Sequence, residues 1–241
     1  GTADTARAAA AKLGTSARLA VIPGKPLPPR WTGKLWAVHQ GVQHALNSRP
    51  DFLLLTDADV EHAPETLATL TAISELGPFD LTSCMVKLHC RSTAEKLLIP
   101  AFVYFFFQLY PPAWIADSRA KTAGAAGGCM LIRPDALVKA GGIEAIRSEI
   151  IDDCALARAV KSSGGNIWLG LTDSSRSLRV YGAFADIGRM ISRTAFNQLH
   201  HSALLLLGTI IGLIITYLFP LALGCPTLTG VGRVGVGSLI G

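Results

Sequence analysis

The stretch FLLLTDADV, residues 52–60, runs from an apolar strand pattern straight into two carboxylates, Asp57 and Asp59. A short apolar run bounded by turn-forming residues is typical of a buried strand. A solvated turn is the simplest explanation for the carboxylates, because aspartate is common in turns. The alternative is a ligand site at the end of the strand, and the surrounding sequence decides between the two.

Strand and helix patterns alternate through the first third of the chain. Residues 18–22 (RLAVI) and 79–86 (FDLTSCMV) have strand patterns, while helix patterns cover about 34–47 and begin again at Pro64. This alternation predicts an α/β fold with a largely parallel sheet. In open sheets of this class, ligands bind at the carboxyl ends of the strands, which is where the two aspartates lie.

Two ionised carboxylates this close repel each other unless one is protonated or a cation lies between them. Carboxylate oxygens suit Mg²⁺ or Mn²⁺, and these cations often bind substrate phosphates as well. Asp57 and Asp59 are therefore predicted to hold a divalent metal.

The composition places part of this chain in or on a membrane. Half of the residues are hydrophobic and 16% are charged, against roughly 25% charged in ordinary soluble domains. The net charge of +5 comes without a block of like charge, so no nucleic-acid partner is expected. The five cysteines form no CxxC pair and no zinc-binding spacing, which indicates reduced thiols in a cytosolic compartment.

Two apolar segments are candidates for membrane contact. The run 97–107 is too short to cross a bilayer core of about 30 Å. Tyr104, Tyr110 and Trp114 in and after it are residues that favour the membrane interface, so we expect an interfacial segment, with a buried core helix as the alternative. The segment 201–224 carries an uncharged run long enough to span as a helix.

The charges around the second segment predict its orientation. Arg189, Arg193 and two histidines precede it, and only Arg233 follows. The positive-inside rule therefore places the region before the segment on the cytoplasmic side. Residues 225–241 are rich in Gly and Val without a usable period, and their structure is not predicted.

A run of small residues and a second acidic pair follow the first apolar segment. Gly127 and Gly128 end the run AGAAGG, which leaves room for a close backbone approach. Asp152 and Asp153 stand at or just before the start of a helix pattern. A simple helix cap is one explanation for this pair, because acidic side chains stabilise helix N-termini.

Five motifs in order resemble membrane-attached family 2 glycosyltransferases. The nearest group is the hopene-associated glycosyltransferases of hopanoid biosynthesis, with a layout related to ceramide glucosyltransferases. The motifs are GKLWAVHQG (33–41), LLLTDADV (53–60), AGGCMLIRPDAL (126–137), IIDDCALA (150–157) and GRMISRTAFNQL (188–199).

This resemblance implies a GT-A fold, in which a Rossmann-like nucleotide half joins an acceptor half. Residues 1–200 would form this domain without its first strands, and a transmembrane helix at 201–224 would follow. The implied reaction moves a sugar from a nucleotide-sugar donor to a lipid such as a hopanoid, with inversion and with Mg²⁺ or Mn²⁺. The implied location is the cytoplasmic side of a bacterial inner membrane.

The resemblance also implies roles for particular residues. On the donor side, Asp57 and Asp59 match the DxD pair that holds the metal and the diphosphate, and Gly33 and Lys34 match a neighbouring donor-binding step. Arg193 would supply a cation for the phosphates, although the Trp that follows the corresponding Arg in related enzymes is replaced by Thr here.

On the acceptor side, Asp153 matches the catalytic base, and Asp152 is the neighbour that shapes the site. Gly127 and Gly128 match the acceptor-side loop.

Two other functions fit the acidic pairs. A metal-dependent nucleotidyl or phosphoryl transferase also uses paired aspartates, but it normally needs a third metal carboxylate, for which only Asp152 and Asp153 are candidates. In a membrane-anchored binding module without catalysis, the acidic pairs would be turns and caps.

Overall fold

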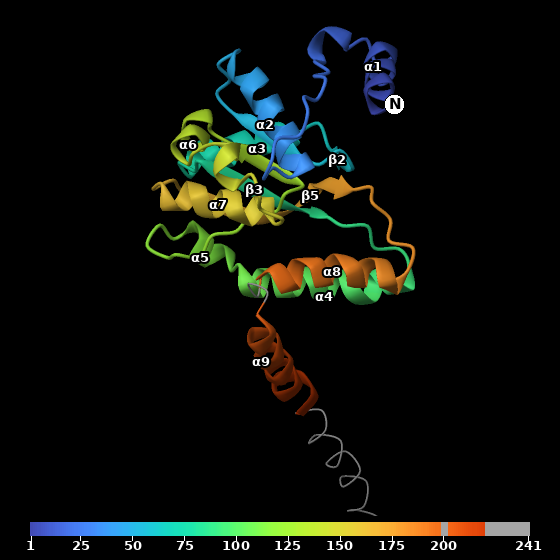
Figure 1. Cartoon of the computed structure of the whole chain (residues 1–241), viewed down its shortest axis with the longest axis vertical. Helices are drawn as coiled ribbons and strands as arrows, with labels where there is room; N and C mark the ends of the chain where they lie inside the picture. Colours follow the sequence, from blue (N-terminus) through green and yellow to red (C-terminus); the bar gives the residue numbers. More distant parts are fainter. Residues whose placement is uncertain (199–201, 220–241) are drawn as a thin grey trace, which may run out of the picture. The chain divides into compact units, whose positions relative to one another are not determined.

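The computed structural model describes residues 1–198 and 202–219, and the side chains of residues 193–198 lie outside that description. The chain divides into two compact units, Gly1–Ile187 and a second that begins at Gly188. The first unit contains the sheet and all the candidate site residues except Arg193 (Figure 1). The predicted division near residue 201 falls within the second unit and stays a prediction.

A five-stranded mixed sheet forms the centre of the first unit, in the order β1–β4–β3–β5–β2. The α/β class is confirmed, but the prediction of a largely parallel sheet is wrong. Of the neighbouring pairs, β3–β5 is parallel and the other three are antiparallel, because β4 returns between β1 and β3 and β2 returns beside β5. The strands are β1 (Leu53–Thr56), β2 (Val60–His62), β3 (Leu81–Lys87), β4 (Cys129–Ile132) and β5 (Ile167–Ser177).

Helices connect and cover these strands. The predicted helix patterns near 34–47, after Pro64 and at the second acidic pair are confirmed. In the first unit the helices are α1 (Thr2–Lys12), α2 (Gly33–Leu46), α3 (Thr66–Leu76), α4 (Thr93–Leu109), α5 (Pro112–Ala116), α6 (Pro134–Lys139) and α7 (Asp152–Ser162), with 3₁₀ turns at Ser16–Arg18 and Ile143–Ile146. Helix α8 (Phe184–Gln198) crosses the boundary between the two units.

The core lies on both faces of the sheet, because side chains along β3 and β4 alternate between them. Leu81 and Ile132 pack on the face shared with α2 and α7, where Leu156 is also buried. Leu131 packs on the opposite face with Leu70 of α3. The sheet is therefore covered by helices on both sides, as expected for an α/β domain.

The predicted strand at 18–22 is wrong. Arg18 ends the 3₁₀ turn and residues 19–22 have no regular structure, with Leu19 and Ile22 exposed. No described strand lies beside them, so neither ladder hydrogen bonds nor burial holds an extended conformation in place.

The apolar segment that the sequence places at an interface forms α4 and α5. Together they make Thr93–Ala116, which is, within residues 1–198 and 202–219, the one helical segment long and apolar enough to cross a membrane. It is longer than the apolar run 97–107 because α4 is not interrupted at Pro100, already begins at Thr93, and is followed by α5. Only 17% of its most apolar window is buried, so the core-helix alternative fits it poorly.

The two sides of this segment have different surroundings. Ile99 and Tyr110 are buried against the domain, whereas Leu97, Leu109 and Trp114 are 59–65% exposed. The exposed stripe is therefore apolar, the reverse of the pattern on a helix that faces water.

The second apolar segment is helical where the structure describes it. Helix α9 (Ala203–Leu213) continues into a π-helical stretch, Ile214–Leu218, and together they form an apolar helix shorter than a span. Residues 220–224 of the predicted transmembrane helix, and the tail 225–241, lie outside the described residues. A helix that spans the membrane here stays a prediction.

A buried carboxylate ties the start of α4 to the segment after β5. Glu95 is fully buried and accepts backbone N–H groups from Arg91 at 3.0 Å, Ser92 at 2.9 Å and Tyr181 at 2.8 Å. Oε1, the oxygen that accepts the Tyr181 N–H, also lies 2.8 Å from His89 Nδ1. The Tyr181 N–H above all lowers the pKa of Glu95, although burial opposes this.

We predict that Glu95→Gln lowers the melting temperature at neutral pH, because an amide can accept fewer of these N–H groups. The pKa of Glu95 is lowered in the folded state, so its contribution is present above the ordinary value of 4.5 and is lost as pH falls below it. The difference from wild type should therefore shrink in acid. Circular dichroism melts at several pH values measure this, with the exposed Glu75→Gln as control; equal melting of all three proteins would contradict it.

Candidate active site

The two aspartates of the first motif lie on a tight turn between β1 and β2. The Val60 N–H donates to the Asp57 carbonyl at 3.2 Å and closes the turn, and the Leu178 N–H donates to the Asp59 carbonyl at 2.7 Å. Because β1 pairs with β4 and β2 pairs with β5, both ends of the turn are fixed to the sheet. The simple turn explanation is correct for the backbone, but it leaves both carboxylates available for a ligand.

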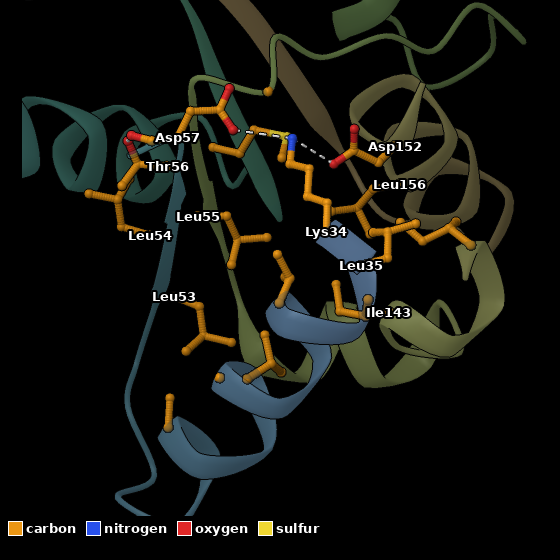
Figure 2. Close-up of a pocket in the computed structure, with 17 residues that line it drawn as sticks. Lys34, Leu35, Leu53, Leu54, Leu55, Thr56, Asp57, Ile143, Asp152 and Leu156 are labelled. Atoms are coloured by element: carbon orange, nitrogen blue, oxygen red, sulfur yellow. Dashed lines mark hydrogen bonds and ion pairs between the residues drawn. The ribbon is translucent and has the colours of Figure 1, made fainter. Parts of the chain in front are cut away.

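Lys34 joins the two acidic pairs. Its Nζ lies 3.1 Å from Asp57 Oδ1 and 3.0 Å from Asp152 Oδ2, as Figure 2 shows. Thr32 caps helix α2 by accepting the Leu35 N–H, so Lys34 is held in its first turn. Partial burial would lower the pKa of Lys34, but the Asp152 and Asp57 carboxylates raise it above the ordinary value.

Asp153 faces a different partner from its neighbour. Its Oδ2 accepts the Gly127 N–H at 2.8 Å, and its Oδ1 accepts the Cys154 N–H at 2.7 Å. Burial raises the pKa of Asp153, and the nearby Asp152 carboxylate raises it further, while these two N–H groups and Lys34 act in the other direction. Asp153 thus accepts one N–H of its own helix, as a capping side chain does, and its second oxygen reaches across to the small-residue run.

Gly127 and Gly128 allow this close approach. A Cβ on Gly127 would lie 3.2 Å from Asp153 Oδ2, and one on Gly128 would lie 3.2–3.4 Å from methyl groups of Val86 and Val60. A side chain would therefore be tight against the Asp153 carboxylate at Gly127 and against the two valines at Gly128. The sequence prediction that this run permits a close backbone approach is therefore confirmed.

A pocket of about 290 Å³ opens between α2 and β1. Its floor is apolar, with Leu35, Leu53 and Ile143 among the side chains that line it, whereas Lys34 and its two carboxylate partners lie together at one end (Figure 2). The polar chemistry of the site is thus confined to that end.

The carboxylates on the turn suit a divalent metal whose remaining coordination positions are filled by a substrate and water. Within the part of the chain that the structure describes, no group of three or more His, Cys, Asp or Glu side chains is arranged to hold a metal alone. Mg²⁺ is usually bound through one or two carboxylates together with water and substrate phosphates. Asp57 and Asp59 match that smaller donor set.

The remaining predicted residues are less closely joined to the site. Gly33 begins α2 beside Lys34, but a Cβ there would meet open space, so the packing does not require glycine. Arg193 belongs to α8, and its side chain lies outside the described residues. Its role stays a prediction.

Sequence reasoning missed the side chains on the sheet that form hydrogen bonds with the small-residue run. Ser83 contacts Ala126, and Thr56 donates to the Gly128 carbonyl at 2.9 Å while lying 2.7 Å from His62 Nε2. Nothing in their spacing distinguishes these residues, because the contacts join segments that are far apart in the chain.

Comparison with known proteins agrees with this geometry. No curated protein matches the chain. The model of glycosyl transferase family 21 matches residues 33–193, a range that contains every predicted site residue. The ceramide glucosyltransferase-like layout of the GT-A clan is thereby confirmed, and the family number is corrected from 2 to 21. The chain belongs to glycosyl transferase family 21 and is a glycosyltransferase.

Proposed function

We propose that this glycosyltransferase moves a sugar from a nucleotide-sugar donor to a hydroxyl group of a membrane lipid, in one displacement with inversion. The observation that carries the proposal is the position of Lys34, within 3.1 Å of Asp57 on the donor side and 3.0 Å of Asp152 beside the base. Donor and acceptor groups are thus joined in one site. The donor class follows from the family.

The donor side would bind the diphosphate. Asp57 and Asp59 are the residues that would hold Mg²⁺ or Mn²⁺, which neutralises the charge that develops on the departing phosphate. Lys34 supplies a second positive charge on the same side, and its ammonium is half exposed, so a phosphate can reach it. Gly33 beside it leaves open space at the helix start, and Arg193 is proposed to contribute a further cation.

Asp153 is proposed as the general base. Its Oδ2 would accept the proton of the acceptor hydroxyl as the acceptor oxygen bonds to the anomeric carbon and the bond from that carbon to the phosphate oxygen breaks. A raised pKa makes Asp153 a stronger base than an ordinary aspartate. Lys34 balances the charge of Asp152, which limits the repulsion that Asp153 meets when it is ionised.

The apolar stripe of α4 and α5 supports a lipid acceptor, because it ends beside the helix that carries the base. Lys161 of the same helix as Asp153 donates to the carbonyls of Trp114 at 3.1 Å and Ile115 at 2.8 Å. Tyr110 packs so closely on the run before Gly127 that a Cβ on Gly124 would lie 2.5 Å from its ring. A lipid at the stripe would therefore lie beside the catalytic helix.

The acceptor lipid and the location are proposed from the sequence resemblance and from the charges beside α9. We propose a hopanoid or another polycyclic or long-chain lipid as acceptor. Members of this family are membrane-associated, and the basic flank of α9 favours a catalytic domain on the cytoplasmic side of a bacterial inner membrane. Of the two other functions considered, family membership supports neither the nucleotidyl transferase nor the binding module.

The first prediction concerns the metal. Asp57→Asn and Asp59→Asn should each weaken Mn²⁺-dependent binding of UDP or GDP at least about tenfold, the effect of losing about 1.4 kcal/mol. Isothermal titration measures this. Asp51→Asn, an exposed aspartate just before β1, is the control. Full Mn²⁺-dependent affinity in both site variants would rule out a metal at this turn.

The second prediction concerns Asp153. Asp153 must be ionised to act as the base, and its pKa is raised above 3.8, the ordinary pKa of aspartate. Activity should therefore be lost on the acidic side at a pH above 3.8. Stability should change in the opposite direction. A raised carboxyl pKa means that the folded state binds the proton more tightly than the unfolded state does. The free energy of unfolding therefore falls as pH rises from 3.8 through the raised pKa, by at most about 1.4 kcal/mol per pH unit.

Asp153→Asn should lower turnover by about 10²–10⁴-fold and flatten that part of the stability profile. Asp135→Asn on α6 is the matched control. Denaturant titrations across pH and product formation with a panel of nucleotide sugars and lipid extract measure both effects. Unchanged turnover in the Asp153 variant would show that another group is the base.

The third prediction concerns the lipid face. An environment-sensitive fluorophore on a cysteine at Leu97 or Leu109 should emit at shorter wavelength when liposomes are added, whereas one at Leu67, a similarly exposed leucine of α3, should not. The exposed Cys90 is replaced beforehand, as is Cys225. Leu97→Ser with Leu109→Ser should also raise KM for lipid acceptors and leave donor binding unchanged. Identical emission at all three positions would mean that the stripe is not in lipid.

A further inference from the structure

A buried serine on the central sheet holds the backbone that contacts the proposed base. Ser83 of β3 is fully buried, and its Oγ accepts the Ala126 N–H at 2.8 Å and donates to the Ala126 carbonyl at 3.1 Å. One side chain thus satisfies both polar backbone groups of the residue that precedes Gly127. The Ala126 carbonyl also accepts the Cys129 N–H at 3.3 Å, in the turn that leads into β4.

The next peptide is the one that reaches Asp153. Because Ala126 is fixed on both sides of its Cα, the Gly127 N–H has little freedom to turn away from Asp153 Oδ2, which it meets at 2.8 Å. Gly127 itself has no side chain to hold it. The direction of this N–H therefore depends on Ser83, together with the Cys129 N–H that bonds to the same Ala126 carbonyl.

A second contact holds the other end of the same loop. Thr56, at the end of β1, donates to the Gly128 carbonyl at 2.9 Å. Thr56 is exposed, so water competes for this hydrogen bond and it constrains the loop less than the buried serine does.

We infer that Ser83 is a positioning residue of the glycosyltransferase: it fixes the Ala126 peptide so that the Gly127 N–H orients the Asp153 carboxylate toward the acceptor hydroxyl. The inference rests on the proposed role of Asp153 as the base. Ser83 touches neither substrate and acts only through the loop.

The electrostatic surroundings of Asp153 define what a change at Ser83 can alter. Asp152, Lys34 and the Cys154 thiol are the charged or titratable groups that act on it from α7 and α2. The described hydrogen bonds of Ser83 both join Ala126. A shift in the titration of Asp153 after substitution of Ser83 would therefore come through the small-residue run, which reaches Asp153 by the Gly127 N–H and contacts Cys154 at Ala125.

The chain offers a matched control for general loss of stability. Ser74 of α3 is also a buried serine, 1% exposed, and its Oγ lies 2.6 Å from Thr82 Oγ1. Ser74→Ala and Ser83→Ala each remove one hydroxyl group from a buried site, but only the Ser83 site is connected to Asp153. A merely structural role would make the two variants behave alike.

The experiment follows Asp153 directly, by ¹³C NMR titration of its carboxyl carbon in the full chain. In Ser83→Ala the carboxyl should titrate at higher pH than in wild type, because a hydrogen bond that favours the charged form is weakened. In Ser74→Ala it should titrate as in wild type. Turnover should fall about tenfold in Ser83→Ala, part of the roughly 10²–10⁴-fold contribution of a general base, while Mn²⁺-dependent UDP binding should not change.

Wild-type titration of Asp153 in Ser83→Ala would overturn the inference, as would an equal shift in both serine variants. If Ser83→Ala does not fold, Ser83→Cys, which keeps a weak hydrogen-bonding group, should give a smaller shift in the same direction, and no shift would also overturn it. The titration needs no substrate. A failure of the proposed function, seen as wild-type turnover that survives Asp153→Asn, is therefore distinct from a failure of the role of Ser83.

Discussion

The candidate site depends on the ion pairs that the Lys34 ammonium group makes with two carboxylates. The carboxylates of Asp57, after β1, and Asp152, on α7, lie at the same end of the pocket, with Asp153 next in the chain. Like charges this close repel unless a cation lies among them. Lys34 contacts Asp57 and Asp152, and its charge also favours the ionised form of Asp153. The start of α2, the end of β1 and the start of α7 are thereby held together.

The sheet gives this constraint its rigidity. The Asp57–Asp59 turn is anchored on one side through β1 to β4 and on the other through β2 to β5, and the loop before β4 is held by the buried Ser83 of β3. The acidic turn and the small-residue run are thus attached to neighbouring strands of one sheet. Groups carried on strands and helices are positioned more accurately than groups on free loops.

In the proposed function, the apolar stripe of α4 and α5 would bring a membrane lipid to this site. Its buried side packs on the domain, its exposed side remains apolar, and Lys161 fixes its end to the helix that carries Asp153. Proximity of this kind lets an enzyme act on an acceptor that stays in the bilayer. The substitutions Leu97→Ser and Leu109→Ser separate that role from packing, because neither leucine is in the core.

The sequence by itself determined the elements and the acidic motifs, because strand and helix periodicity and the placement of Asp57, Asp59, Asp152 and Asp153 are local properties of the chain. It failed where the outcome depends on a distant partner. The segment 18–22 has a strand pattern but no strand beside it, and β4 enters the sheet antiparallel, which no local pattern specifies. The position of Lys34 between two carboxylates and the contact of Ser83 with Ala126 were likewise decided by the tertiary structure, because each joins segments that only the folded sheet brings together.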